Sequence, residues 1–283
     1  MGATSPRSRR VRLRLEFDGA LFCGWQLQSD VHESRRTSVQ GEVERALRVL
    51  TRSSERIVVQ GCGRTDAGVS AREFFAHFDM PEAFRLPEGD VEFEKFRHSL
   101  NGILPEGVAV TRLDTVAADF HALKDVVWKT YEYSLLLRRA KATLERNSCY
   151  WIPESSEVFR IDELRRTLEV FEGRHDFVAF AAADHTAKTT VREIFETKLL
   201  TEALGVSPSD GLLLRLHFTG EGFLKYMVRT LAGTLVEVGQ GKRDAASVSL
   251  LLDGTAQRPE AGHCAPAHAL RLIKVSYEPR RAP

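Results

Sequence analysis

The stretch Gly61-Cys62-Gly63-Arg64-Thr65-Asp66-Ala67-Gly68-Val69-Ser70-Ala71 decides how we interpret this chain. It lies between two apolar runs, 57–59 and 74–78, that are typical of β-strands. Its glycines allow tight turns with positive φ, and they surround a single carboxylate, that of Asp66. The pattern predicts a pinned loop between two strands that holds Asp66 and Arg64 in fixed positions.

Two familiar glycine-rich loops do not fit this stretch. A dinucleotide fingerprint needs a third glycine where Asp66 stands, and a carboxylate there would repel a pyrophosphate. A phosphate-binding P-loop needs Gly-Lys followed by Ser or Thr, and the stretch contains no lysine. Spacing alone leaves two interpretations open: a reactive carboxylate, or a hairpin whose surface aspartate caps a turn.

Composition places the chain among ordinary globular proteins. Its 283 residues suggest two domains or one large one, 43% hydrophobic residues suffice for a sizeable core, and the formal net charge is only +1. Positive charge gathers near the start, where several arginines precede the first acidic residue, Glu16: Arg7, Arg9, Arg10, Arg12 and Arg14. Such a cluster can contact phosphates or form a solvated tail.

Cysteine spacing and hydropathy argue against several other classes of protein: zinc-binding, redox-active, membrane-spanning, secreted and myristoylated proteins. The cysteines are widely separated and form no CxxC pair, which disfavours a zinc site or a thioredoxin-like redox motif. No hydrophobic run is long enough to cross a bilayer, and neither a signal-peptide core nor a myristoylation motif is present. We expect a cytoplasmic protein that binds no membrane and no metal.

Apolar periodicity predicts two halves with similar α+β order. The first half is predicted as a strand at 11–17, a helix from 39 with a Thr37–Gln40 capping box, strands at 57–59 and 74–78, a helix over 93–103 and a strand at 108–110. The second is predicted as a strand at 131–137, a helix over 161–171, strands at 191–200 and 212–218, helices over 222–238 and 245–252, and a strand at 270–275. We therefore expect a basic tail, 1–9, and domains at 10–113 and 114–283.

Lys225 and Arg229 form a second charged pair of interest. On the predicted helix 222–238 they lie four residues apart, and like charges at this spacing destabilise a helix by a few tenths of a kcal/mol. A carboxylate such as that of Asp66, or a phosphate, would reverse the sign of this effect. Two solvated side chains are the alternative interpretation.

The stretch Gly61–Val69 strongly resembles the catalytic motif of the tRNA pseudouridine synthase A (TruA) family. Further segments that match in the same order are 17–19, 24–28, 38–42, 119–122, 129–133, 173–177, 227–229 and 265–267. The resemblance extends from about residue 10 to about residue 277. A single short motif would be weak evidence, but an ordered set of this length is specific.

The resemblance implies the pseudouridine synthase fold, in which two similar α/β-sandwich-like domains share a twisted, mainly antiparallel sheet with a central basic cleft. It also implies a homodimer that isomerises uridine to pseudouridine at positions 38, 39 and 40 of the tRNA anticodon stem-loop, without a cofactor. By this resemblance Asp66 is the catalytic nucleophile, and the other roles are shared among Arg64 (base flipping), Tyr131 (packing on the flipped uracil) and Arg229 (pairing with Asp66). Candidate RNA contacts are Arg12, Arg14, Lys129 and Lys225.

These roles agree with the chemistry of the reaction. Breaking the C1′–N1 bond, turning the uracil and rejoining it through C5 needs a carboxylate to form or stabilise the intermediate, but no outside group. A neighbouring guanidinium lowers the pKa of such a carboxyl group. The base leaves its stack at a cost of a few kcal/mol, and an aromatic platform stabilises it by about 1–3 kcal/mol. Attack at C1′ or at C6, and proton transfer by Tyr131, stay open at this point.

The chain departs from the family pattern at three positions. Ser70 stands where the family most often has His, Leu123 where it usually has Arg, and Lys129 where Arg is common. Two alternatives to the enzyme are a catalytically idle tRNA-binding or chaperone protein on the same fold, and an aspartate-nucleophile hydrolase. The hydrolase needs a metal-binding acidic residue close to Asp66, and residues 64–70 contain no second one.

Overall fold

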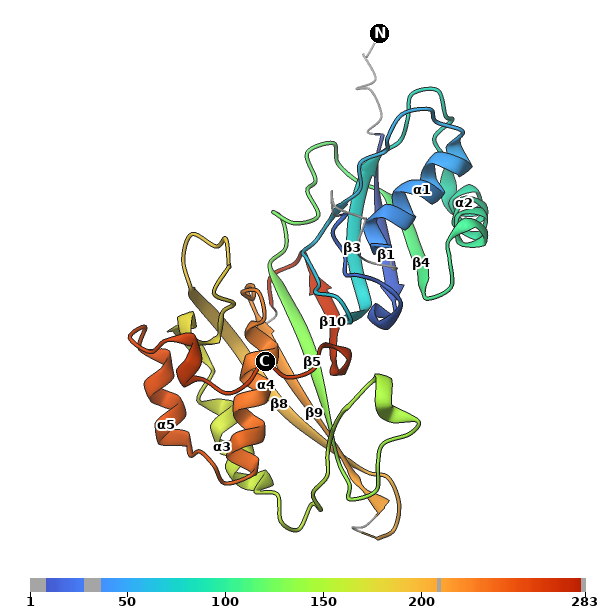
Figure 1. Ribbon diagram of the computed structural model, residues 1–283. Coiled ribbons are helices and arrows are strands. Elements are labelled where there is room, and N and C mark those ends of the chain that lie inside the picture. The colour runs from blue at the N-terminus through green and yellow to red at the C-terminus, as the bar shows by residue number, and fades with distance from the viewer. Residues whose placement is uncertain (1–8, 28–36, 208–209, 281–283) are drawn as a thin grey trace. The chain divides into compact units, whose positions relative to one another are not determined.

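The computed structural model describes residues 9–27, 37–207 and 210–280, which form two compact units (Figure 1). Unit 1 is the chain up to Val127 together with Lys274–Glu278, and unit 2 is Trp128–Ile273 together with the residues from Pro279. Of the predicted tail 1–9, only Arg9 lies within the described residues.

The division between the units falls later than the predicted boundary after residue 113. The segment that follows β4 (Val108–Thr115) still belongs to unit 1, because its backbone is bonded there. The amide of Val116 donates to the carbonyl oxygen of Arg10 (3.0 Å), and the amide of Ala122 donates to Nδ1 of His77 (3.1 Å).

Unit 1 is built on an antiparallel sheet with the order β4–β1–β3. β1 (Arg10–Phe17) lies between β4 and β3 (Ser70–Asp79), and the short β2 (Gln60–Gly61) pairs with β3. The alternation predicted for β1 is confirmed, since Val11, Leu13 and Leu15 are fully buried. Two helices, α1 (Val39–Thr51) and α2 (Gly89–Ile103), pack beside each other and against this sheet (Figure 1).

The start of α1 corrects the predicted capping box. Ser38, not Thr37, is the N-cap, and its Oγ accepts a hydrogen bond from the amide of Gly41 (3.1 Å). The side chain of Gln40 is instead buried, where it donates to the carbonyl oxygen of Val59 (3.0 Å). The amide of Val59 also donates to the side chain of Glu44 (3.1 Å), so side chains of α1 bond both backbone groups of Val59. Residues 57–59 form no strand, and the strand predicted there is wrong.

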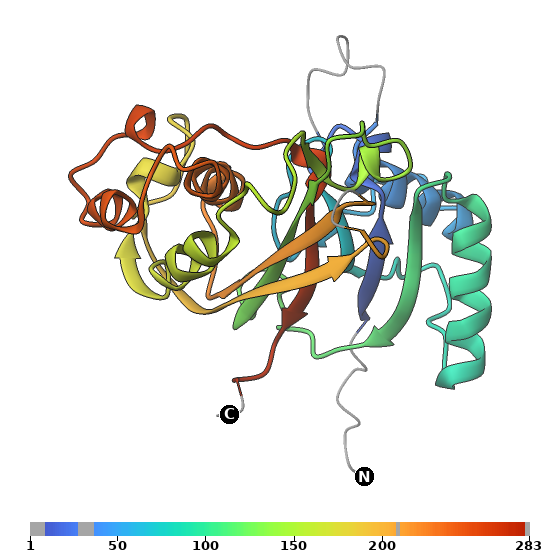
Figure 2. The same cartoon turned by 90° about the horizontal axis from the view of Figure 1, so that it is seen from below.

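Unit 2 contains an antiparallel sheet with the order β5–β9–β8–β7. Its strands are β5 (Trp128–Leu137), β9 (Leu212–Gly220), β8 (Val191–Ala203) and β7 (Gly173–Asp176), and β6 (Tyr150–Ile152) pairs with β5 in parallel. β6 and β7 are not predicted, because neither is long enough to show an alternation. The helices α3 (Ile161–Glu169), α4 (Met227–Gly239) and α5 (Ala245–Ser249) lie together on one face of the sheet (Figure 2).

Helix α4 starts later than predicted. Tyr226 adopts the left-handed conformation (φ 66°, ψ −3°), through which a right-handed helix cannot continue, so α4 begins at Met227 rather than at residue 222. Lys225 therefore lies outside the helix, and the predicted like-charge pair of Lys225 and Arg229 on one helix face is wrong. Near the end of the chain, Leu250–Leu252 form a 3₁₀ turn where the helix 245–252 was expected to continue.

The predicted fold class, α+β with a mainly antiparallel sheet, is confirmed. The last strand, β10 (Leu270–Ser276), crosses the division of the chain, because its residues from Lys274 onward belong to unit 1. Within the described ranges, no helix combines the length and the apolar character needed to span a membrane. The basic cleft between the two domains stays a prediction.

Candidate active site

The loop that carries Asp66 comprises residues 62–69 of unit 1, between β2 and β3. The amide of Cys62 donates to the carbonyl oxygen of Phe75 on β3 (2.7 Å), and the amide of Trp25 donates to the carbonyl oxygen of Thr65 (3.2 Å). Cys62 is fully buried and Thr65 is only 8% exposed. These bonds hold both the base and the middle of the loop, which confirms the predicted pinned loop.

Gly24 lets a second segment approach this loop closely. Its φ is +108°, and a Cβ atom there would lie 2.7 Å from the carbonyl oxygen of Thr65. Glycine alone tolerates both conditions. Of the three glycines in the stretch 61–71, Gly68 has a positive φ (84°), whereas Gly61 and Gly63 do not use this freedom.

Ser70 anchors the end of the loop. Its Oγ accepts a hydrogen bond from the amide of Gly19 (3.0 Å), at the start of a 3₁₀ turn, Gly19–Leu21. Asp18 caps that turn by accepting from the amide of Ala20 (3.0 Å). The hydroxyl at position 70, where the family most often has His, thus has a defined structural role in this chain.

Asp66 and Arg64 flank the buried Thr65. The side chain of Arg64 is exposed and Asp66 is half-buried. The loop therefore presents a carboxylate and a guanidinium outward, while Thr65 anchors it inward. A carboxylate presented in this way can act as a nucleophile or stabilise a developing positive charge.

In unit 2, Tyr131 and Arg229 belong to one region around the start of α4. Tyr131 lies on β5, opposite Phe218 of β9, and its ring meets that of Phe223 edge to face with centroids 5.2 Å apart. The guanidinium of Arg229 lies over the ring of Tyr226, 4.9 Å from its centroid. Phe223 falls within the predicted helix 222–238, but in the structure it lies in the segment before α4.

Arg229 is also held by a segment far along the chain. Its Nε donates to the carbonyl oxygen of Ala265 (2.8 Å), and the amide of Ala265 donates to the carbonyl oxygen of Arg229 (3.1 Å). The match of 265–267 to the family motif indicated that this segment matters. It did not indicate how, because Ala265 holds Arg229 through its backbone carbonyl, which the residue type does not reveal. The contact of Tyr226 with Arg229 was not predicted either, because the residue type does not reveal the left-handed backbone conformation of Tyr226.

Arg12, a candidate RNA contact on β1, is enclosed by unit 1. Its guanidinium forms an ion pair with Asp114 (2.6 Å), and its side chain is 25% exposed. It also lies over three rings, those of Phe75, Phe120 and Tyr277, at 5.4, 5.6 and 5.9 Å from their centroids. These contacts give Arg12 a structural role, and an RNA contact at this residue stays a prediction.

The other candidate RNA contacts also have partners within the protein. Arg14 pairs with Glu73 (2.6 Å), and Lys225 pairs with Asp184 (2.6 Å) at the surface of unit 2. Lys129 is half-buried on β5. Lys225 and Arg14 each have 41% of the side chain accessible, against 25% for Arg12, and the carboxylate partner of Lys225 is itself 72% exposed.

Comparison with known proteins supplies the family. A family model described as tRNA pseudouridine synthase matches residues 168–278. The tRNA pseudouridine synthase A of a Geobacter species is 36% identical over 269 residues, which cover 95% of this chain and 99% of the relative. The protein of the same name from Thermus thermophilus is 37% identical over 269 residues, covering 95% and 97%.

Among solved structures, the chain is similar to one titled "Crystal Structure of a Cbf5-Nop10-Gar1 Complex", with 10% identity and a TM-score of 0.33, covering 93% of this chain and 48% of that one. This likeness is too slight to carry an argument, so the assignment depends on the curated relatives. At their level of identity over nearly the whole length, the chain belongs to the tRNA pseudouridine synthase A family, whose members are isomerases that convert uridine to pseudouridine.

Proposed function

We propose that this protein converts uridine to pseudouridine in the anticodon stem-loop of tRNA, at positions 38, 39 and 40, with Asp66 as the nucleophile. The observation that carries the proposal is the pinned loop 62–69, which presents a half-buried carboxylate two residues after an exposed guanidinium. The names of the curated relatives support tRNA as the substrate.

In this proposal the target base first leaves its stack. Arg64, exposed on the loop, helps to displace the base, and the half-buried ring of Tyr131 packs against the flipped uracil. Unstacking costs a few kcal/mol, and stacking on an aromatic ring offsets about 1–3 kcal/mol of that cost. Phe223 supports the platform, because its ring meets that of Tyr131 edge to face.

The carboxylate of Asp66 then attacks the nucleotide, and the C1′–N1 bond breaks with its electron pair going to the uracil. The uracil turns and C5 bonds to C1′, while the bond between Asp66 and the nucleotide breaks and returns its electron pair to the carboxylate. The proton on C5 is lost and N1 takes up a proton, so substrate and product have the same composition. The same carboxylate serves attack at C1′ or at C6. Arg229 is the proposed partner that lowers the pKa of this carboxyl group and keeps it ionised.

The proposal includes a cytoplasmic homodimer, for which the support is the resemblance to the family. Light scattering on the purified protein measures the subunit number. We expect a mass of about twice 31.8 kDa, and a mass of one subunit at working concentration would contradict the dimer.

Transcribed tRNAs with uridine at only one of positions 38, 39 and 40 test the reaction and its sites. We expect pseudouridine at each uridine-bearing position, and none in a tRNA that has cytidine at all of them. The idle RNA-binding alternative predicts that every tRNA binds and none is converted. Conversion confined to uridines outside the anticodon stem-loop would contradict the proposed sites.

A further inference from the structure

The ring that precedes helix α4 is contacted by two cations. Nζ of Lys225 lies 5.2 Å from the centroid of the Tyr226 ring, and the guanidinium carbon of Arg229 lies 4.9 Å from it. The face of an aromatic ring attracts a cation within about 6 Å of its centroid. Lys225 is also bound to Asp184 (2.6 Å), so the two cations are held in different ways.

The backbone of Tyr226 is strained where it makes these contacts. Its φ of 66° is rare for a bulky residue, and such conformations persist only where the surrounding structure imposes them. Its carbonyl oxygen accepts the first bond of α4 from the amide of Thr230 (2.9 Å). Arg52, the other described non-glycine residue with positive φ, ends helix α1, where a left-handed cap is ordinary.

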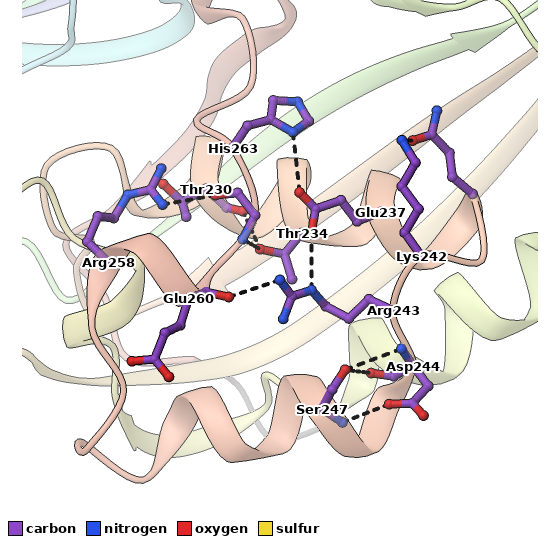
Figure 3. Close-up of polar contacts among 12 residues, drawn as sticks. Thr230, Thr234, Glu237, Lys242, Arg243, Asp244, Ser247, Arg258, Glu260 and His263 are labelled. Carbon is purple, nitrogen blue, oxygen red and sulfur yellow. Dashed lines mark hydrogen bonds and ion pairs between the residues drawn. The ribbon is translucent and has the colours of Figure 1, made fainter.

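A strap formed by residues 258–265 holds Arg229 from a second direction. Ala265 at its end accepts from Nε of Arg229 (2.8 Å). The strap is fastened to α4, because the amide of Gly262 donates to Oγ1 of Thr234 (3.0 Å) (Figure 3). The approach is close enough that a Cβ atom on Gly233 would lie within 1.9 Å of a strap carbonyl oxygen, that of His263.

Charged side chains brace the strap further along α4. Glu237 forms an ion pair with Nε of Arg243 (3.2 Å), and its other carboxylate oxygen lies 3.8 Å from Nδ1 of His263 (Figure 3). Arg243 also donates to the carbonyl oxygen of Glu260 (2.9 Å). The position of Ala265, and with it that of the Arg229 side chain, is therefore set by contacts along the length of the helix.

We propose that Tyr226 is a positioning residue for Arg229. Its ring holds the face of the guanidinium while the carbonyl oxygen of Ala265 holds Nε, so an anion meets the guanidinium through its terminal nitrogens in one orientation. A planar guanidinium fixed at two places is preorganised toward a carboxylate or a phosphate. This inference rests on the proposed role of Arg229 beside the catalytic carboxylate.

Three substitutions separate the ring from the strained backbone. Tyr226→Phe keeps the ring, so kcat should stay within about twofold of wild type. Tyr226→Leu removes the ring, and Tyr226→Asn removes it while placing a residue that accepts the left-handed conformation. Both should lower kcat about tenfold with little change in KM, because the contact with Arg229 is lost in each. Wild-type kcat in the Asn variant would overturn the proposal.

The pH profile gives a readout that a merely structural role would not move. A displaced guanidinium no longer lowers the pKa of the catalytic carboxyl group, so the acidic limb of the kcat profile should move to higher pH in Tyr226→Leu and Tyr226→Asn. It should stay in place in Tyr226→Phe. An unshifted limb in all three variants would contradict a role through Arg229.

A double-mutant cycle with Arg229→Gln decides between positioning and direct contact with RNA. If Tyr226 acts through Arg229, then Tyr226→Asn should slow the Arg229→Gln protein by less than about twofold. A tenfold loss in both backgrounds would overturn the proposal and indicate that the ring contacts RNA. Wild-type turnover by the Arg229→Gln protein would refute the positioning role of Tyr226, because that role presupposes that Arg229 is needed. A wild-type protein that forms no pseudouridine would instead refute the proposed function.

Discussion

The loop of Asp66 and the start of helix α4 are fixed by different kinds of contact. In the loop the bonds join backbone groups, such as the amide of Trp25 and the carbonyl oxygen of Thr65, and Gly24 allows the close approach. At α4 the functional side chain itself is held, by the ring of Tyr226 and by a carbonyl oxygen 36 residues further along the chain.

The difference predicts how each region fails. A loop held by backbone bonds should tolerate many side-chain changes but not a Cβ atom added where two segments touch. A cation held by a ring and a distant strap should respond to changes in those partners, even though they do not take part in the reaction. The two regions can therefore be disturbed separately.

Gly24→Ala should have the largest effect among substitutions that touch no charged group. The added Cβ meets the carbonyl oxygen of Thr65 at 2.7 Å with φ at +108°, so the loop must move. We expect the free energy of unfolding to fall by about 1–3 kcal/mol. Turnover should fall by about 100-fold, the usual cost of misplacing a reacting group by about 1 Å.

Gly102→Ala is the matched control for this loop prediction. A Cβ on Gly102, in helix α2, would meet nothing within 4 Å, so this change should raise the free energy of unfolding by about 0.5–1 kcal/mol and leave turnover intact. Urea unfolding and pseudouridine formation measure both quantities. Wild-type turnover by Gly24→Ala would show that the loop is not held as described.

Gly233→Ala tests the strap in the same way and should have a smaller effect. Its Cβ would lie 1.9 Å from the carbonyl oxygen of His263, which forces the strap away from α4 and loosens Ala265. We expect a loss of about 1–3 kcal/mol in the free energy of unfolding and a decrease in kcat of about tenfold. Gly222→Ala, with no atom within 4 Å of the added Cβ, is the control. If the Gly233→Ala protein is destabilised but has wild-type kcat, the strap does not position Arg229.

Acid should weaken unit 1 through His77, which lies on the strand that leaves the Asp66 loop. His77 is 3% exposed, and burial, together with the positive charge of Arg10, lowers its pKa from 6.5 to about 4, against the opposing charges of Asp79 and Asp125. The folded protein therefore keeps the ring neutral where the unfolded chain binds a proton. This contribution is complete above about pH 6.5 and is lost as the pH falls toward 4.

We expect the His77 contribution to total about 3 kcal/mol across this window. Urea unfolding of wild type and His77→Asn at several pH values measures it as a difference in slope, with the variant depending less on pH. His98→Asn, at an exposed position of α2, should keep the wild-type slope. Equal slopes for wild type and His77→Asn would contradict the lowered pKa.

Lys225→Gln should have the smallest effect on stability. The ion pair with Asp184 is exposed, and such pairs contribute about 0–1 kcal/mol. If Lys225 contacts a phosphate, the slope of log K against log salt for tRNA binding should fall by about one. Asp184→Asn removes the same ion pair and keeps the cation, so its slope should not fall. Equal slopes in both variants would show that Lys225 does not contact a phosphate of the tRNA.

Local patterns predicted much of the fold correctly. The apolar alternation at 11–17 predicted β1, and the apolar periodicity that begins at residue 39 predicted α1, because each pattern lies within one element. The side chains of Val39, Val43 and Leu47 are indeed buried. The glycine-rich stretch predicted a pinned loop for the same reason. Its bonds to Trp25 and Phe75 involve backbone groups, whose partners the sequence does not reveal.

The failures came from contacts between distant segments. The run 57–59 has strand-forming residues, but buried side chains of α1 bond the amide and the carbonyl group of Val59. Arg12 fits an exposed basic face of β1, yet rings from β3 and from the end of the chain surround it. The helix period continues through Tyr226, and only its left-handed backbone stops α4 from starting earlier.

The Asp66→Asn protein tests the central claim most directly, through tritium release from tRNA labelled at C5 of uridine. Asparagine has the shape of aspartate but is a far weaker nucleophile, so we expect release to fall by at least about 10³-fold. Binding of tRNA should stay within about threefold of wild type, because the loop is held by its backbone. Tritium release at the wild-type rate by Asp66→Asn would contradict the account.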